Sequence, residues 1–173
     1  MGSYLRVRFD QLPPSENRIR VHRWQGGEAY SAEALVYRRT FLDHVSRKYF
    51  QEIQAFLRAH RETSLYTLTV VYTLPSSAVL NKGWFSQTRD GKRKASSVYK
   101  RKDTGNMDKL LVDSLVLALG GASGAFDDSL CFGWNLVRRV GPEHGVELVL
   151  EEEPPGAYGV RLEDPWWDTR STS

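Results

Sequence analysis

Apolar and polar side chains alternate along Tyr4–Phe9, which is the pattern of a half-buried β-strand. From Ala32 to about His60 the apolar residues instead recur at three- and four-residue spacing, as they do along one face of a long helix. Ser31 precedes this run and is suited to cap the helix N-terminus. The paired prolines in segment 12–18 lack backbone donors, so we expect a turn or rigid loop there, followed by polar sequence up to Ser31.

A strand, a long loop and a second helix are predicted in the middle of the chain. Leu65–Leu74 is rich in β-branched and aromatic residues and stops at Pro75, which indicates a central strand. The loop that follows carries glycines and many basic residues, and loops of such length are usually functional or disordered. Asn106–Leu119 then shows helical spacing and is ended by Gly120 and Gly121.

Two strands complete the pattern. Apolar side chains alternate from Leu130 to Leu136, and Gly145–Glu151 predicts a last strand, reached by a hairpin that turns through Gly141 and Pro142. The order is strand, helix, strand, helix, strand, strand. It indicates an α/β fold in which a small mixed β-sheet carries two main helices.

Length and composition suit one domain with a core of its own, since 40% of the 173 residues are hydrophobic and 12% are aromatic. We expect this domain to span 1–151 and an acidic tail to span 152–173. No apolar run is long enough to cross a bilayer and no secretory pattern is seen at the N-terminus, so we expect a cytoplasmic protein without a membrane partner. The single cysteine, Cys131, lies in an apolar run and suits a buried filler better than a zinc ligand.

Charge is distributed unevenly along the chain, although the formal net charge is only +3. Segment 82–102 contains one acid, Asp90, and eight basic residues: Lys82, Arg89, Lys92, Arg93, Lys94, Lys100, Arg101 and Lys102. This density fits a phosphate-binding footprint, and a solvated loop kept soluble by its lysines is the alternative. Trp84 and Phe85, in the same loop, are suited either to stack on an unpaired base or to pack the loop onto the domain.

Acidic and basic residues also flank the second predicted helix. Asp103 lies just before it, Lys109 lies within its first two turns, and Asp127 and Asp128 open the next strand. Consecutive elements are usually neighbours, so these groups can converge. Mg²⁺ relieves repulsion between such carboxylates and keeps waters that can be activated for attack on a phosphate, which Lys109 can bind. The alternative needs no metal: Asp103 as a helix N-cap, Lys109 as a solvated residue and the Asp pair as a turn.

Four blocks in this order, LPPSENR, AYSAEALVYR, RKDTGNMDKLLVDSL and FDDSL, resemble the RusA-type Holliday-junction resolvases, a family chiefly of phage and prophage origin. The resemblance covers about Tyr4 to Glu151. It implies a homodimer with a RusA-like fold that binds branched DNA in the cytosol of a bacterium or phage-infected host. The implied activity is that of an endodeoxyribonuclease that resolves four-way junctions by paired symmetric nicks, with Mg²⁺ or Mn²⁺ and no small-molecule cofactor.

The family pattern is an Asp, any residue, a second Asp, Asn, an apolar residue, any residue and Lys, with paired Asp at a later strand start. Asp103, Asn106 and Lys109 match the first Asp, the Asn and the Lys, and Asp127 and Asp128 match the later pair. The resemblance therefore implies that Asp103, Asp127 and Asp128 hold the metal and that Lys109 steadies the phosphate. Asn106 would orient a ligand or the attacking water.

Gly105 departs from this pattern, because it occupies the position of the second Asp. Asp108 is one candidate to replace the missing carboxylate, although helix geometry turns it away from the face shared by Asn106, Lys109 and Asp113. Asp113, which matches a further helix acid of the family, is a second candidate. The third explanation is a weakened site in a protein that binds junctions and cuts them slowly or not at all.

The implied DNA contacts and the competing functions complete the sequence-based hypothesis. The candidate DNA-binding residues are Lys92, Arg93, Lys94, Lys100, Arg101, Lys102 and Trp84. Competing functions are a non-catalytic branched-DNA-binding protein, a general flap or branch nuclease, and a structural dimer of phage replication machinery. We expect the apolar face of a helix to supply the dimer interface.

Overall fold

The computed structural model describes residues 3–15, 18–22, 28–61, 63–98, 105–120, 125–154 and 156–157. Of His22, Glu28, Gly105 and Asn106, only the backbone is described. The strands are β1 (Tyr4–Phe9), β2 (Arg20–His22), β3 (Glu28–Tyr30), β4 (Tyr66–Leu74), β5 (Cys131–Val140) and β6 (Gly145–Glu152). The α-helices are α1 (Ala32–Lys48), α2 (Phe50–Ala59), α3 (Ser76–Val79) and α4 (Gly105–Ala118), and short 3-10 turns form η2 (Lys82–Trp84) and η4 (Asp128–Leu130).

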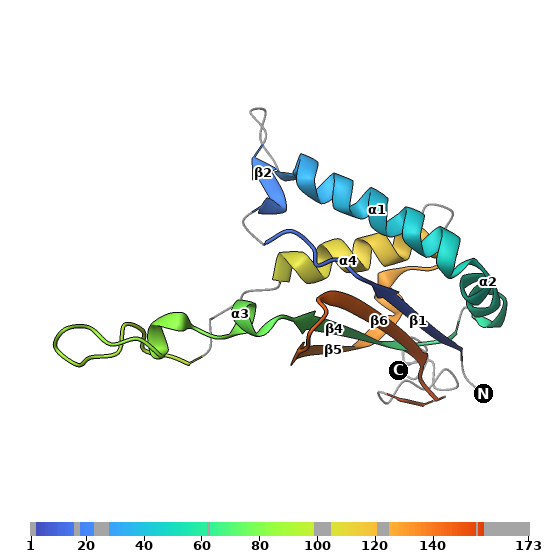
Figure 1. The fold of residues 1–173 in the computed structure, drawn as a ribbon. Coiled ribbons are helices and arrows are strands. Elements are labelled where there is room, and N and C mark those ends of the chain that lie inside the picture. Colours follow the sequence, from blue (N-terminus) through green and yellow to red (C-terminus); the bar gives the residue numbers. More distant parts are fainter. Residues whose placement is uncertain are drawn as a thin grey trace, which may run out of the picture.

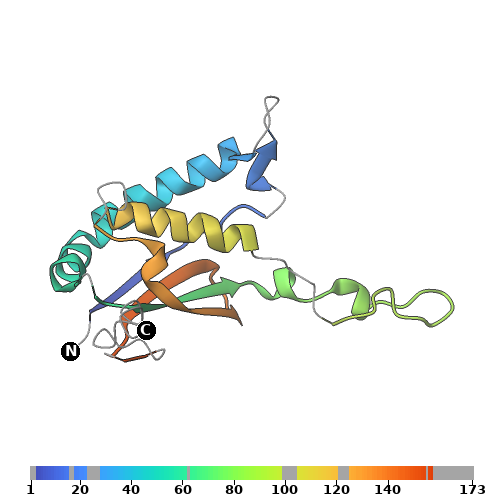
Figure 2. The ribbon, with the colours of Figure 1, turned by 180° about the vertical axis from the view of Figure 1, so that it is seen from behind.

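A four-stranded mixed sheet with the order β1-β6-β4-β5 forms the base of the fold. Strand β6 is antiparallel to both of its neighbours, β1 and β4, whereas β5 runs parallel to β4. Helices α1 and α4 contact each other and lie on the same side of this sheet (Figures 1 and 2). The predicted α/β class, with helices packed on a small mixed sheet, is therefore confirmed.

The predicted hairpin between the last two strands is wrong. Strands β5 and β6 lie on opposite sides of β4, so the segment through Gly141 and Pro142 carries the chain across the end of β4. The Gly141 N–H donates to the carbonyl of Leu74 at 3.1 Å during this crossing. Strand β6 is buried along most of its length, in keeping with its position between β1 and β4.

The single long helix predicted from Ala32 to His60 is also wrong, because Tyr49 separates α1 from α2. Its backbone, with φ −120° and ψ 18°, leaves the helical region, and its N–H caps α1 by donating to the carbonyl of Val45. The helical spacing continues across the break because both helices bury apolar side chains in one core. The predicted N-cap is confirmed, since the Ser31 hydroxyl accepts the Ala34 N–H at 3.1 Å.

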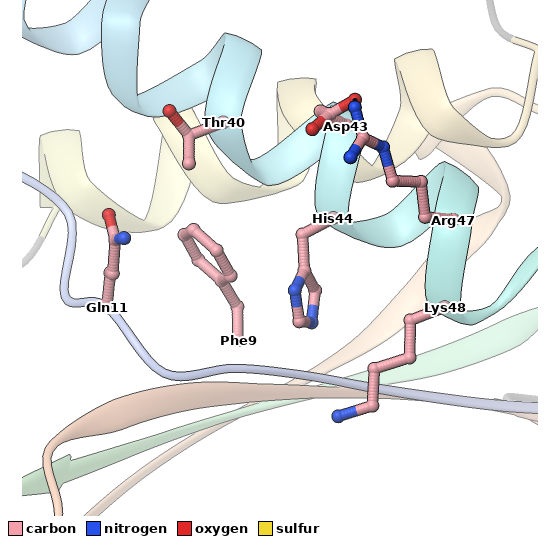
Figure 3. A pocket seen from close by; sticks show the side chains of 7 residues that line it. All are labelled: Phe9, Gln11, Thr40, Asp43, His44, Arg47 and Lys48. Carbon is pink, nitrogen blue, oxygen red and sulfur yellow. Dashed lines mark ion pairs between the residues drawn. The ribbon is translucent and has the colours of Figure 1, made fainter.

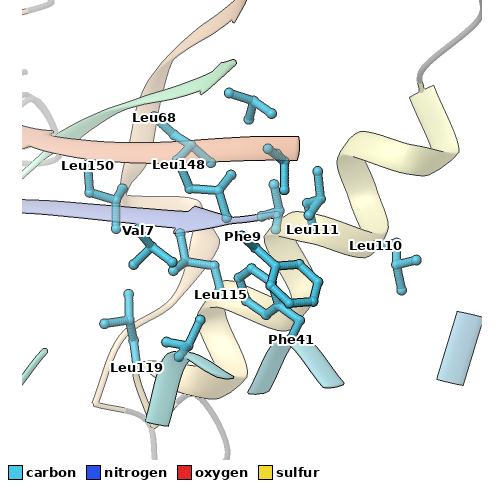
Figure 4. Packing of buried hydrophobic residues seen from close by; sticks show 14 of the residues in the cluster. Val7, Phe9, Phe41, Leu68, Leu110, Leu111, Leu115, Leu119, Leu148 and Leu150 are labelled. Atoms are coloured by element: carbon cyan, nitrogen blue, oxygen red, sulfur yellow. The ribbon is translucent and has the colours of Figure 1, made fainter. Parts of the chain in front are cut away.

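The hydrophobic core fills the space between α1, α2, α4 and one face of the sheet, which we call the helix-bearing face (Figure 4). Residues of this face alternate along each strand as predicted for β1: Leu5, Val7 and Phe9 on β1, Val146, Leu148 and Leu150 on β6, and Leu68, Val70, Tyr72 and Leu74 on β4. Phe41 of α1 and Leu110, Leu111 and Leu115 of α4 are buried against them. These contacts fix α4, and with it the candidate site, on the sheet.

A two-stranded hairpin, β2–β3, lies at the N-terminal end of α1 and was not predicted (Figure 1). Each strand has only three residues, which is too short for a visible alternation, and the pairing runs from Arg20 opposite Tyr30 to His22 opposite Glu28. The hairpin is joined to α1 through Ser31, whose N–H donates to the carbonyl of Ile19. This places Tyr30 against α4.

No helix within the described ranges is both long enough and apolar enough to cross a membrane.

Truncating Phe41 should test how much the contact between α1 and the sheet contributes to stability. Phe41 is fully buried, so Phe41→Ala leaves a cavity and should lower the free energy of unfolding by about 3–5 kcal/mol. Val36 lies on the same helix with 66% of its side chain exposed, and Val36→Ala should change this free energy by no more than about 0.5 kcal/mol. Urea unfolding followed by circular dichroism measures both, and equal losses would contradict the assigned core.

Candidate functional site

Helix α4 presents two of its candidate residues, Lys109 and Asp113, on one side. The Lys109 ammonium lies 3.7 Å from the Asp113 carboxylate, one helical turn away. The same carboxylate accepts a hydrogen bond from the hydroxyl of Tyr30 on β3. Asp113 is therefore held between its own helix and the β2–β3 hairpin.

Tyr30 is kept in its protonated, donating form by its surroundings. Burial, followed by the hydrogen bond to Asp113, raises the pKa of Tyr30 from 10.0 to about 12. Two cations oppose this shift: the guanidinium of Arg38 lies 4.4 Å from the centre of the Tyr30 ring and that of Arg20 lies 5.8 Å from it. At neutral pH the phenol thus donates to Asp113 and does not compete with it for cations.

Asp108 lies on the opposite, sheet-facing side of α4. Its carboxylate accepts a hydrogen bond of 2.6 Å from the hydroxyl of Tyr72 on β4. Burial, and then the contact with Asp108, raises the pKa of Tyr72, whereas Arg138, its register partner on β5, lowers it. This agrees with the expected helix geometry, in which Asp108 is turned away from Lys109 and Asp113.

Asp127 and Asp128 lie side by side in the sequence at the turn before β5, and both are exposed. The Asp127 carboxylate accepts the backbone N–H of Ser129 at 2.8 Å and so caps η4, and hydrogen bonding to Ser129 lowers the pKa of Asp127. The prediction that Asp127 has a structural role in a turn is therefore confirmed. The side chains of Asp127 and Asp128 nevertheless remain exposed.

Cys131 follows this turn and is buried, as predicted. Burial, followed by the negative charges of Asp128 and Asp127, raises the pKa of its thiol to about 12. A thiol that stays protonated is a poor nucleophile and a poor metal ligand.

The structure brings some of the predicted site residues together and leaves others apart. Helix α4 contacts η4, so the helix and the Asp pair are neighbours. Asp108, however, contacts Tyr72 near the end of β4, whereas the Asp pair precedes Cys131, which pairs with Tyr66 at the start of β4. Asp103, Lys100, Arg101 and Lys102, together with the side chain of Asn106, lie outside what the structure describes.

The part of the chain that the structure describes contains no group of three or more His, Cys, Asp or Glu side chains placed to hold one metal ion. Two adjacent exposed carboxylates, Asp127 and Asp128, are nevertheless a suitable oxygen donor set for Mg²⁺, which keeps several waters and often takes one or two carboxylates from the protein.

Residues 82–98 project from the end of β4 as an arm, which we call the basic arm (Figures 1 and 2). Its outer part turns back on itself: the Lys94 N–H donates to the carbonyl of Ser86, the Thr88 N–H donates to that of Lys92, and Gly91 adopts φ +73° at the turn. At its base, the Asn81 N–H donates to the carbonyl of Val98 at 2.8 Å. The loop predicted here thus forms a hairpin-like projection.

Cations and aromatic rings share the surface of the basic arm. Lys92, Arg93 and Lys94 are exposed, and the guanidinium of Arg93 lies 3.7 Å from the centre of the Trp84 ring. This contact covers one face of Trp84, which is half-buried, while Phe85 is 67% exposed. Phe85 is therefore the more accessible ring for stacking, a distinction that the sequence alone does not make.

A hollow between α1 and the end of β1 was not predicted and lies apart from these residues (Figure 3). It is lined by Phe9, Gln11, Thr40, Asp43, His44, Arg47 and Lys48. Its polar groups are largely engaged with each other or the backbone, since Asp43 pairs with Arg47 at 2.9 Å and His44 Nε2 lies 3.0 Å from the carbonyl oxygen of Arg8. We assign it to packing between helix and strand.

Comparison of the chain with known proteins found no family model that matches it and no matching curated protein.

The hydrogen bond from Tyr30 to Asp113 should stabilise the fold in a pH-dependent way. Tyr30→Phe removes the donor and should lower the free energy of unfolding by about 1–2 kcal/mol. Because the folded-state pKa of about 12 exceeds the ordinary 10.0, this stabilisation is complete below pH 10 and is lost as the pH rises toward 12. Urea midpoints of both proteins between pH 7 and pH 11 measure it.

A double-mutant cycle with Asp113→Ala separates this bond from the loss of the hydroxyl alone. Additive effects of Tyr30→Phe and Asp113→Ala would mean that the bond contributes nothing to stability.

Proposed function

We propose that this protein is a Mg²⁺-dependent, structure-specific endonuclease that resolves four-way DNA junctions by paired symmetric nicks. One structural observation carries the proposal: two exposed carboxylates, Asp127 and Asp128, lie beside α4 in a molecule that also projects a basic arm. The resemblance of four sequence blocks to the RusA-type resolvases supports the choice of substrate. The mixed α/β sheet with helices on one face is compatible with that resemblance.

Asp127 and Asp128, together with Asp103, would hold the metal ion. Mg²⁺, when bound, supplies an activated water and neutralises charge on the phosphate. The hydrogen bonding to Ser129 that lowers the pKa of Asp127 keeps this carboxylate ionised and fixes its orientation. Asp127 therefore offers a pre-oriented ligand, and Asp128, at the start of η4, offers a second carboxylate beside it.

Cationic groups would bind and position the DNA. Lys109 is 55% exposed and only loosely paired with Asp113, so its ammonium is able to reach a phosphate at the cost of a weak surface ion pair. Lys92, Arg93 and Lys94 on the basic arm would contact the sugar-phosphate backbone without reading sequence. Phe85 or Trp84 would stack on bases that are unpaired at the branch point.

The contacts of α4 bear on the carboxylate that Gly105 lacks. Asp108 would have to leave Tyr72, and Asp113 would have to leave Tyr30, before either could join Asp127 and Asp128. Both moves leave a phenol hydroxyl without its acceptor, which is unfavourable. These contacts argue against a replacement carboxylate from the helix.

The second candidate function is that of a branched-DNA-binding protein that cuts slowly or not at all. It is favoured by the hydrogen bonds that Asp108 and Asp113 accept from tyrosines. With both carboxylates engaged in this way, the site has one carboxylate fewer than the family pattern. A general flap or branch nuclease is the other alternative, and substrate preference among four-way, three-way and flap DNA separates it from a resolvase.

Cleavage of a labelled synthetic four-way junction tests the proposal directly. With Mg²⁺, the protein should make paired symmetric nicks that EDTA abolishes, and Asp128→Asn should reduce the cleavage rate at least about 100-fold while junction affinity is retained. Asp43→Asn, an exposed carboxylate on α1, is the matched control and should cut normally. Tight junction binding without nicks in either Mg²⁺ or Mn²⁺ would favour the binding protein instead.

The salt dependence of junction binding tests the role of the basic arm. Lys92→Gln combined with Lys94→Gln removes two exposed cations and should reduce the slope of log affinity against log salt concentration by about 2. Arg58→Gln on α2 is the matched control and should leave the slope unchanged. An unchanged slope in the double variant, measured by fluorescence anisotropy, would show that the arm does not contact phosphates.

A further inference from the structure

Three cations lie around the pair formed by Tyr30 and Asp113, where α1, α4 and the β2–β3 hairpin meet. The guanidinium of Arg38, on α1, lies 4.4 Å from the centre of the Tyr30 ring, and that of Arg20, the register partner of Tyr30 on β2, lies 5.8 Å from it. The third cation is Lys109 on α4, whose ammonium lies 3.7 Å from the Asp113 carboxylate. We call these five residues the Tyr30 cluster.

Positive charge exceeds negative charge in the Tyr30 cluster. Asp113 is its single carboxylate, and the charged groups that shift the pKa of Tyr30 are this carboxylate and two guanidinium groups. Asp113 already accepts the Tyr30 hydroxyl, and its contact with Lys109 is a partly exposed ion pair, which is weak. A surface where several cations share one carboxylate attracts an anion from solution.

The charge of Arg38 is held by the ring of Tyr30 and not by a carboxylate. Within the described ranges no Asp or Glu side chain forms an ion pair with Arg38, and its Nε–H is buried without a hydrogen-bond acceptor. Folded proteins rarely leave a buried donor unpaired, so such a group calls for a functional explanation. Arg38 as a whole is only partly buried, which leaves part of this side chain in contact with solvent.

The Tyr30 cluster lies toward the end of the molecule from which the basic arm projects. Both α1 and α4 begin at this end, so the positive ends of two helix dipoles point the same way (Figures 1 and 2). Asp108, the neighbour of Lys109, contacts Tyr72 near the end of β4, and the arm follows the same end of this strand. Asp127 and Asp128 instead precede β5, whose first residue pairs with the start of β4. The cluster is therefore separate from the Asp pair.

We infer that the Tyr30 cluster binds the oxygen atoms of a phosphate group and that Arg38 is the residue that donates to them. A guanidinium presents parallel N–H donors that match two oxygens of one phosphate. Stacking on Tyr30 orients these donors without neutralising their charge. Lys109 supplies a second positive charge to the same surface.

This inference rests on the proposed function for the source of the phosphate, which is the sugar-phosphate backbone of DNA. Lys109 is 55% exposed and Arg38 is partly exposed, so the cluster is an open surface that a continuous strand can cross. Its position toward the end that carries the basic arm gives the DNA two separate phosphate contacts there. Contacts of this kind fix the orientation of the DNA and do not read its sequence.

Inorganic phosphate tests the site without DNA. In potassium phosphate, compared with potassium chloride of equal ionic strength, the urea midpoint of the wild-type protein should rise in a saturable way, because a ligand of the folded state stabilises that state. Arg38→Gln should abolish the saturable rise, whereas Arg47→Gln, in the last turn of the same helix, should retain it. The general stabilisation of proteins by phosphate is common to all three proteins and does not saturate.

Junction binding in EDTA, where no cleavage takes place, tests the source of the phosphate. Arg38→Gln should weaken the affinity for a four-way junction at least about tenfold and lower the slope of log affinity against log salt concentration by about 1, because one charged contact is lost. Arg47→Gln should change neither. If Arg38→Gln abolishes the response to inorganic phosphate but leaves junction binding unchanged, the assignment to DNA is wrong.

A measurement on the wild-type protein avoids any effect of Arg38→Gln on folding. The Nε–H group of Arg38 is buried, so its NMR signal is protected from exchange with water and reports on the guanidinium. Inorganic phosphate should shift this signal, which is identified by its absence in Arg38→Gln, and should leave that of Arg47 in place.

An unmoved Arg38 signal, or equal stabilisation of the wild-type protein and Arg38→Gln by phosphate, would overturn the inference. A protein that binds no junction contradicts the proposed function instead, and the experiments with inorganic phosphate then decide the site by themselves.

Discussion

The contact between α4 and the helix-bearing face of the sheet is the constraint on which the rest of the molecule depends. Leu110 and Leu111 are fully buried in it, and Ser114, also fully buried, satisfies its hydroxyl by donating to the carbonyl of Leu110. Once this face of α4 is fixed, helix geometry dictates where the remaining side chains point. Asp108 must face Tyr72, and Lys109 and Asp113 must face the β2–β3 hairpin.

The carboxylates around α4 are distinguished by their partners and not by their residue type. Asp108 and Asp113 each accept a hydrogen bond from a tyrosine whose pKa is raised mainly by burial, and such a phenol stays neutral throughout the physiological range. Asp127 accepts a backbone N–H and stays exposed, beside an exposed Asp128. Asp108 and Asp113 therefore stabilise the fold, whereas the exposed side chains of Asp127 and Asp128 are accessible to a cation.

Much of this fold could be predicted from local pattern, and the failures share a cause. The alternation in Tyr4–Phe9 and the β-branched run before Pro75 both predict strands correctly. A strand buried on one face alternates apolar and polar residues, and a strand buried on both faces is a continuous apolar run, so both can be recognised in the sequence. The break at Tyr49 cannot be recognised in this way, since apolar spacing continues through it. The position of β6 between β1 and β4 likewise depends on which strands pair, which no local pattern records.

In the candidate site, too, the contacts within one helix could be predicted from the sequence, whereas the contacts between distant segments could not. That Asp108 and Lys109 lie on different sides of a helix follows from their spacing alone. That Tyr30 holds Asp113 does not, because the hairpin carrying Tyr30 has strands too short to be recognised and meets α4 only in the folded chain. The position of β5 at the edge of the sheet could not be predicted for a similar reason. The alternating pattern of apolar residues is the same in a central strand and in an edge strand.

The hydrogen bond between Asn81 and Val98 at the base of the basic arm has a consequence for how such a protein can diversify. The backbone enters and leaves the arm at almost the same point, so sixteen intervening residues form an excursion that the sheet and helices do not need for their own closure. Its length, tip and charge can therefore change by insertion or deletion while the side chains around α4 stay in place. The dimensions and charge of the arm are therefore adjustable separately from the surface around α4.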